Sequence, residues 1–147
     1  MRIRHDLPLA ATLLIAATST GFAADGTEGQ VKEAYAAWDA AFNAGNAEDI
    51  GALYTDDATL VPQNNEVIEG PSGVAEFFSG VLGAGFTDHT LEPITIVDGE
   101  AMVSSASRWT VQGKDESGEP VTYEGTAVQT FEKQDDGSLK LRLHSFH

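Results

Sequence analysis

The chain has 147 residues, enough for one globular domain with its own core. Its 23 acidic and 8 basic residues give a formal net charge of −15 at pH 7, and such a surface repels nucleic-acid phosphates and anionic lipid. The absence of cysteine excludes disulfides, thiol catalysis and cysteine-based zinc sites. We therefore expect no nucleic-acid partner and no membrane partner.

The N-terminus has the pattern of a secretory signal peptide. Two arginines within the first four residues form a basic n-region, residues 9–17 form a short apolar core, and small residues precede the cleavage site. The apolar segment is too short and wrongly flanked for a transmembrane helix. We expect a signal peptide at residues 1–23, cleaved after Ala23 or Ala24, and hence a periplasmic or secreted protein. The alternative is a buried N-terminal helix.

Residues 24–30 are polar and are expected to form a flexible lead-in to a domain over residues 31–147. Helical spacing then predicts a first helix that begins at Val31 and exits at Gly45. Its apolar face consists of Val31, Ala34, Tyr35, Trp38, Ala41 and Phe42. Asn46 suits the N-cap of a short second helix that ends in Leu53 and Tyr54.

A strand is expected at residues 58–61, followed by a polar turn at residues 62–66. Gly70 and Pro71 then open a third helix, because proline is tolerated in the first turn. Its apolar stripe consists of Val74, Phe77, Phe78, Val81 and Leu82. Gly83 and Gly85 end this helix.

The rest of the chain predicts four strands, at residues 91–97, 101–111, 121–131 and 139–146. Asp98-Gly99 and Asp136-Gly137 are hairpin turns between them. In the second of these strands, alternate residues from Ala101 to Val111 share one face. In the last strand we expect Leu139, Leu141 and Leu143 on one face, with His144 and Phe146 on the other. Three helices beside an antiparallel sheet define an α+β domain.

With these elements placed, the chain resembles the NTF2-like superfamily, and within it the SnoaL-like and DUF4440 groups, which share the fold of ketosteroid isomerase. The matching segments are residues 37–46, 53–58, 61–62, 68–71 and 137–146. The resemblance implies a cone-shaped fold, with helices packed on a curved antiparallel sheet around a pocket, and often a homodimer. The family's last strand usually has Trp where this chain has Leu139, and often Asp where it has His144.

His144 is the first candidate for chemistry, because a neutral imidazole can accept a proton near neutral pH. The alternative is a structural histidine bonded to the backbone. Tyr54 and Trp38 lie where the helices of the resembled family face its pocket. Tyr54 is a candidate oxyanion donor and Trp38 an apolar wall, but plain core packing is the favoured interpretation of both, because aromatic stripes on helices belong mostly to the core.

Asp57 is a candidate carboxylate at the pocket mouth, although adjacent acids on a turn are more often solvated. Glu69 is a weaker candidate. Arg108 could clamp a carboxylate, but pairing with a neighbouring acid is favoured. Trp109 and Phe146 complete the expected ligand-binding set of Trp38, Tyr54, Trp109, His144 and Phe146. The sequence predicts no metal site and no cofactor, since His144 and His147 point to opposite strand faces and no nucleotide-binding motif is present.

Three hypotheses follow. The first is an exported, homodimeric domain that binds a small apolar molecule in a cone-shaped pocket. The second is an enzyme of the ketosteroid isomerase or polyketide cyclase kind, with His144 as base, Tyr54 as oxyanion donor and Asp57 as a further acid. The third is a non-catalytic dimerisation or assembly module with a closed interior. The sequence does not decide whether the protein is an enzyme.

Overall fold

A computed structural model describes residues 22–147 of the protein. Most of the expected signal peptide lies outside these residues. The elements are α1 (Phe22–Asn43), α2 (Ala47–Gly51), β1 (Tyr54–Val61), β2 (Ile68–Glu69), α3 (Gly70–Gly83), β3 (Thr87–Asp98), β4 (Met102–Lys114), β5 (Pro120–Lys133) and β6 (Leu139–Phe146). No helix among these residues is long and apolar enough to cross a bilayer.

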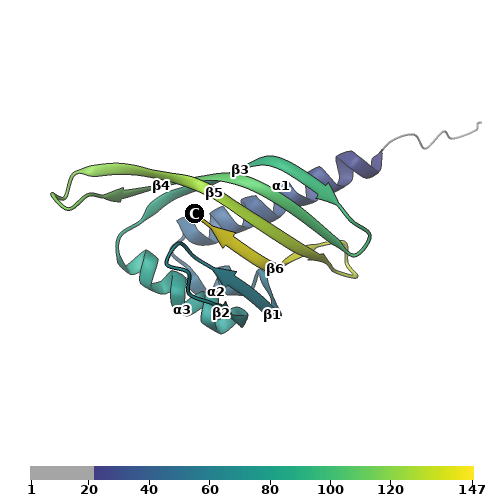
Figure 1. Ribbon diagram of the computed structural model, residues 1–147, viewed down its shortest axis with the longest axis horizontal. Helices are drawn as coiled ribbons and strands as arrows, with labels where there is room; N and C mark the ends of the chain where they lie inside the picture. The colour runs from purple at the N-terminus through teal and green to yellow at the C-terminus, as the bar shows by residue number, and fades with distance from the viewer. Residues whose placement is uncertain (1–21) are drawn as a thin grey trace, which may run out of the picture.

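The strands form one curved six-stranded sheet in the order β2-β1-β6-β5-β4-β3, and the helices pack on one of its faces (Figure 1). This confirms the expected α+β class. All neighbouring strands are antiparallel except β1 and β6, which pair in parallel. A parallel pair needs a long crossover, and α3 with β3, β4 and β5 supplies it between β1 and β6.

The core lies between α1 and the inner face of the sheet. α1 supplies Val31, Tyr35, Trp38 and Phe42, which are at most 4% exposed. The alternation expected in β4 is confirmed, because Val103, Ser105, Ser107, Trp109 and Val111 are all buried. The long β4–β5 hairpin extends beyond the body of the domain (Figure 1).

The first helix begins earlier than the sequence predicts. Residues 24–30, the expected flexible lead-in, belong to α1. Two side chains attach this turn to distant hairpins: the Thr27 hydroxyl donates to Asp98 Oδ2 (2.9 Å), and the Gln30 amide donates to the Gly137 carbonyl (2.7 Å). These long-range hydrogen bonds stabilise a polar segment that has little apolar periodicity of its own.

Tyr54 lies in β1 and not at the end of the second helix. α2 ends at Gly51, and Tyr54 is then in register with Leu141 of β6. The Leu141 N–H donates to the Leu53 carbonyl (2.9 Å), so the parallel pairing with β6 begins at this point. Strand pairing with a distant segment has overridden a weak local helical pattern.

The expected division of β6 into two faces is wrong. Leu141 pairs with Phe131 and Leu143 with Thr130, so the intervening Arg142 is an extra residue, a β-bulge. The bulge reverses the alternation after Leu141. His144 is therefore buried on the same inner face as Leu141, whereas Leu143 is 44% exposed on the outer face.

Candidate functional site

A cavity of about 450 Å³ lies between α1, α3 and the inner face of β3–β6. Most of its wall is apolar. The aromatic side chains in the lining include Trp38, Phe42, Phe78, Trp109, Tyr123 and Phe146. This size and composition are typical of small-molecule sites, in which a few polar groups orient a mostly apolar ligand.

The polar side chains of the lining divide by depth. Gln63, Asn64 and Glu124 are exposed and lie at the mouth. His89 and His144 are buried, at 9% and 4% exposure, and lie at the floor. A molecule that fills the cavity therefore meets two imidazoles at its inner end.

His144 is held by a chain of hydrogen bonds that begins on α1. The Trp38 indole N–H donates to the Tyr54 hydroxyl (3.1 Å), and that hydroxyl lies 2.7 Å from Nδ1 of His144. Trp38 also contacts His144 edge to face, with ring centroids 6.1 Å apart. The imidazole orientation is therefore fixed by two aromatic residues, one from the helix and one from β1.

Burial determines the protonation states of this chain. Desolvation lowers the pKa of His144 from 6.5 to about 3, and the neighbouring His89 adds a smaller repulsion when it is itself protonated. Desolvation likewise raises the pKa of the Tyr54 hydroxyl above its ordinary value. Both groups are consequently neutral at physiological pH.

His89, at the start of β3, has a carboxylate partner. Its Nδ1 lies 2.7 Å from Oδ1 of Asp39, whose other oxygen accepts the Leu91 N–H (3.0 Å). Asn43, one turn further along α1, exchanges two hydrogen bonds with the His89 backbone. Asp39 and Asn43 thus attach β3 to the helix and fix the direction of the His89 ring.

Both histidines follow irregularities in their strands. The register of β3 shifts between Thr87 and Thr90, and Asp88 has φ of 55°, a conformation that Asp tolerates better than most residues. In β6 the bulge at Arg142 precedes His144. β-Bulges redirect side chains and are frequent beside functional sites. Here each one precedes an imidazole that lines the cavity.

The structure brings together most of the expected ligand-binding residues. Trp38, Trp109, His144 and Phe146 all line the one cavity. Tyr54 is 1% exposed and is not in the lining, so it acts on the cavity only through His144 and Trp38.

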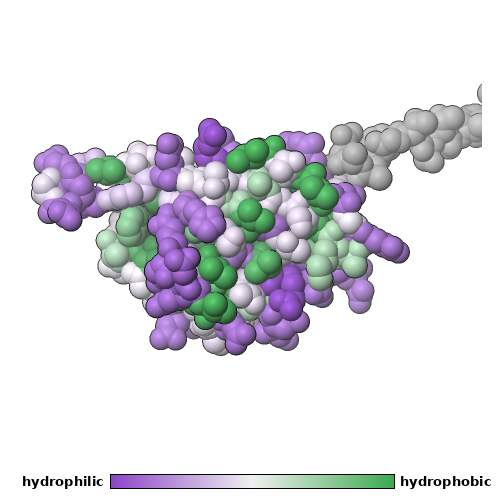
Figure 2. All heavy atoms as spheres, viewed as in Figure 1, coloured by the Kyte–Doolittle hydropathy of each residue, from purple (hydrophilic) through white to green (hydrophobic). Residues whose placement is uncertain are grey.

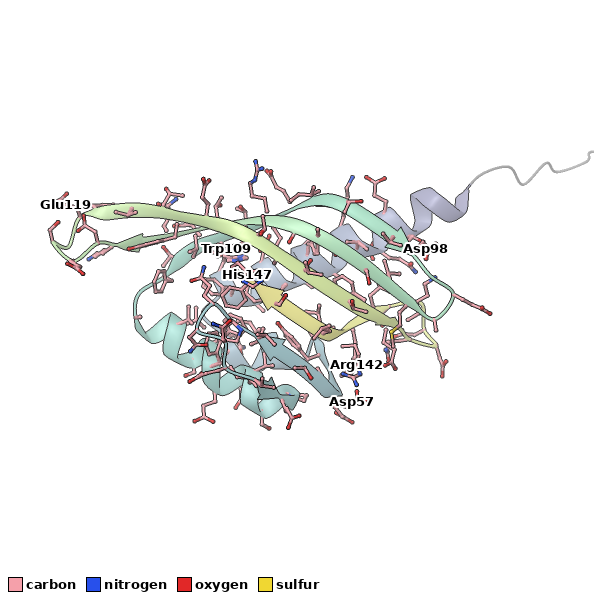
Figure 3. The ribbon with its side chains drawn as sticks, viewed as in Figure 1. Asp57, Asp98, Trp109, Glu119, Arg142 and His147 are labelled. Carbon is pink, nitrogen blue, oxygen red and sulfur yellow. The ribbon has the colours of Figure 1, made fainter. Side chains whose placement is uncertain are left out.

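Asp57 does not lie near the other candidate site residues. Its side chain is 70% exposed and pairs with Arg142 (3.3 Å). Figure 3 shows the two side chains pointing toward each other at an edge of the molecule away from Trp109. Arg108 is exposed on the outer face, opposite Glu92 in the β3–β4 register, so it cannot clamp a ligand inside the cavity.

His89 and Asp39 are functional candidates that sequence reasoning missed. The strand after the third helix was expected to begin only at Leu91, which placed His89 outside the sheet. One signal was available: Asp39 lies four residues after Tyr35 and three before Phe42, so an acid occupies a position beside the apolar face of its helix. No group of three or more His, Asp or Glu side chains within residues 22–147 is placed to hold a metal ion.

Comparison with known proteins places the chain in a family. Residues 33–140 match the SnoaL-like domain, and the protein belongs to this family. The matched range contains Asp39, Tyr54, His89 and Trp109 and ends before His144. No sequence match was found among curated proteins.

Several solved structures share the fold. Aln2 from a Streptomyces species has a TM-score of 0.73 at 17% identity, covering 82% of this chain and 89% of that one. A ketosteroid isomerase-like protein from Erwinia carotovora atroseptica has a TM-score of 0.69 at 19% identity, covering 80% and 92%. An NTF2-like superfamily protein from Salmonella enterica serovar Typhimurium has a TM-score of 0.69 at 14% identity, covering 85% and 92%. At these identities the likeness concerns the fold alone.

Proposed function

We propose that the protein binds a small, largely apolar molecule in the cavity, with the polar end of that molecule at His89 and His144. The observation that carries this proposal is the distribution of polarity in the cavity. Its wall is mostly aromatic and aliphatic, whereas two buried imidazoles occupy the floor. Such an arrangement favours desolvation of an apolar body and hydrogen bonding of one end.

Two neighbouring positions on β5 provide the test. Ala127 is buried and lines the cavity, whereas the adjacent Thr126 is exposed. The Ala127→Phe variant should fill part of the cavity and reduce binding of the neutral dye N-phenyl-1-naphthylamine at least tenfold, a loss of about 1.4 kcal/mol. The Thr126→Phe variant adds the same side chain outside and should bind the dye as the parent does. Thermal melting establishes that both variants fold, and equal binding by both would refute the proposal.

Native mass spectrometry of protein purified from its own cells gives a second test. A retained small molecule that is lost in the Ala127→Phe variant would identify the ligand class. If the parent binds neither a natural molecule nor the dye, the third hypothesis, an assembly module, takes the place of ligand binding.

A second candidate function is proton transfer of the isomerase or cyclase kind. The presence of two imidazoles at one cavity floor favours it. The base is now His89, which has the carboxylate partner, and the oxyanion donor is His144, because Tyr54 does not line the cavity. In this reaction a C–H bond beside a carbonyl breaks, and the proton moves to His89. The electron pair remains on the substrate as an enolate that accepts a hydrogen bond from His144. Exchange of solvent deuterium into 2-acetylnaphthalene should exceed the buffer rate and be lost in His89→Phe; a rate equal to buffer excludes this candidate for that carbonyl class.

The proposal includes export and dimerisation. The pattern of residues 1–23 supports export, and mature protein beginning at Ala24 or Asp25 by mass would establish it. The outer face of the sheet supports pairing of two copies, because it exposes the apolar side chains Val97, Met102, Val128 and Leu143. Figure 2 shows hydrophobic residues at several places over the sheet. Sedimentation should give a dimer that Val128→Glu dissociates; a monomer at all concentrations would refute this part.

A further inference from the structure

The two imidazoles at the cavity floor have different hydrogen-bonding partners, and this difference bears on the ligand. Within residues 22–147 every fully buried side-chain nitrogen or oxygen has a hydrogen-bond partner. The Nε2 atoms of His89 and His144 have no partner there, so neither is fully enclosed. Since both residues line the cavity, both Nε2 atoms open into it.

The proton on His144 follows from its neighbours. The Trp38 indole can only donate, so the Tyr54 oxygen is the acceptor of that bond. The Tyr54 hydroxyl proton must then be donated elsewhere, and Nδ1 of His144 at 2.7 Å is the partner it has. A neutral imidazole that accepts at Nδ1 carries its proton on Nε2. His144 therefore presents an N–H donor to the cavity.

The opposite reasoning applies to His89. An ionised carboxylate only accepts, so the bond to Asp39 requires the proton on Nδ1 of His89. In the neutral ring Nε2 is then an unprotonated acceptor. His89 and His144 are both packed against Trp38, with ring centroids 4.6 and 6.1 Å from it. A donor and an acceptor thus flank the same indole at one cavity floor.

We infer that the ligand is a hydroxyl-bearing apolar molecule, such as an alcohol or a phenol, whose hydroxyl end accepts from His144 and donates to His89. A hydroxyl group is the simplest group that can do both. An ether or a ketone satisfies only His144, and an ionised carboxylate leaves His89 facing a second acceptor. A site built to hydrogen-bond a hydroxyl discriminates strongly against analogues that lack it. This inference rests on the proposed function, because the ligand must occupy the cavity.

The first test needs no ligand and no variant. Nitrogen-15 NMR of the labelled chain at neutral pH reports which ring nitrogen of each histidine carries the proton. We expect the proton on Nε2 in His144 and on Nδ1 in His89, with the exposed His147 as an internal reference. The reverse tautomer at either cavity histidine would overturn the inference while leaving the binding function intact.

The second test measures the ligand class with two matched probes. The parent should bind 2-naphthol about fivefold to tenfold more tightly than 2-methoxynaphthalene, in which methylation removes the donor. This preference should disappear in His89→Phe and persist in the control His147→Phe, with folding of each variant checked by melting. Equal affinity of the parent for both probes overturns the inference alone. Failure of both probes and of the neutral dye to bind overturns it together with the proposed function.

Discussion

Two buried polar clusters meet where β5 and β6 pair, and they differ in one respect. Gln129 and His144 lie opposite each other in the register of these strands, and both face inward. Around Gln129, the hydroxyls of Tyr35, Ser105 and Ser107 form a network with contacts of 2.6 to 3.2 Å. Around His144, the corresponding chain ends at an imidazole with one nitrogen open to the cavity.

This difference distinguishes a cluster that only stabilises the fold from one that can also bind a ligand. In the Gln129 cluster each buried side chain has a hydrogen-bond partner within the protein, and none of the cluster's residues lines the cavity, so the cluster joins α1 to the sheet and does not face a ligand. In the histidine cluster the polar atoms nearest the helix are engaged, whereas the two Nε2 atoms remain for a ligand. Burial of polar groups alone does not identify a site; an unengaged atom facing a cavity does.

Trp38→Ala should produce the largest effect, because Trp38 belongs to the core and to the site. It removes a 4% exposed side chain that packs on Phe42, Phe78 and His89. We expect a loss of about 3–5 kcal/mol in the free energy of unfolding, measured by urea denaturation. Dye binding should fall as well, since the indole supports both imidazoles. A loss below about 1 kcal/mol would mean that the indole is not packed as described.

Gln129→Leu should lower the stability of the protein without changing its ligand binding. It leaves the Tyr35 and Ser107 hydroxyls without their amide partner in a buried position, which should cost about 1–3 kcal/mol of unfolding free energy. Binding of the neutral dye to the folded variant should be unchanged. If the variant loses dye binding while remaining as stable as the parent, the assignment of Gln129 to a purely structural cluster is wrong.

The pH dependence of stability should reveal that His144 is buried as a neutral imidazole. Its pKa of about 3 in the folded protein lies below its ordinary 6.5, so the unfolded chain takes up a proton that the native protein excludes. Stability should therefore fall as the pH drops from 6.5 toward 3, by at most about 1.4 kcal/mol per pH unit from this residue. Above this range the effect vanishes. Carboxylates titrate in the same range, so the measure is the difference from His144→Phe, whose slope should be shallower; equal slopes would contradict the burial of a neutral imidazole.

The sequence predicted the features that depend on local periodicity. The face of β4 that contains Trp109, the stripe of α3 around Phe78 and the class of the fold all follow from spacing of apolar residues. The reason is that one face of each element must be buried, whichever partner covers it. The expectation that Trp38, Trp109 and Phe146 line a pocket came from the family resemblance and not from these patterns.

The predictions from the sequence fail where a side chain depends on a partner far away in the chain, or where a β-bulge interrupts the alternation of a strand. The partner of His89 is Asp39, 50 residues earlier, and neither residue signals the other. The bulge at Arg142 reverses the faces of β6, but nothing in the sequence of that strand marks it. His144 lines the cavity, but alternation had placed it on the face opposite Leu141, whereas the two side chains share the inner face. Its expected role as a base depended on a proton position that only Trp38 and Tyr54 determine.

Asp57→Ala should have the smallest effect. It tests the expectation that Asp57 is a carboxylate at the mouth of the pocket, which the geometry does not support. Asp57 is exposed, and its pairing with Arg142 is a surface ion pair of the kind that contributes less than about 1 kcal/mol. The variant should melt within a few degrees of the parent and bind the dye and 2-naphthol with unchanged affinity. Arg142→Ala, the matched variant on the other side of the pair, should behave in the same way. A specific loss of binding in Asp57→Ala, absent from Arg142→Ala, would return Asp57 to the site and would mean that the mouth of the cavity extends to the edge formed by β1.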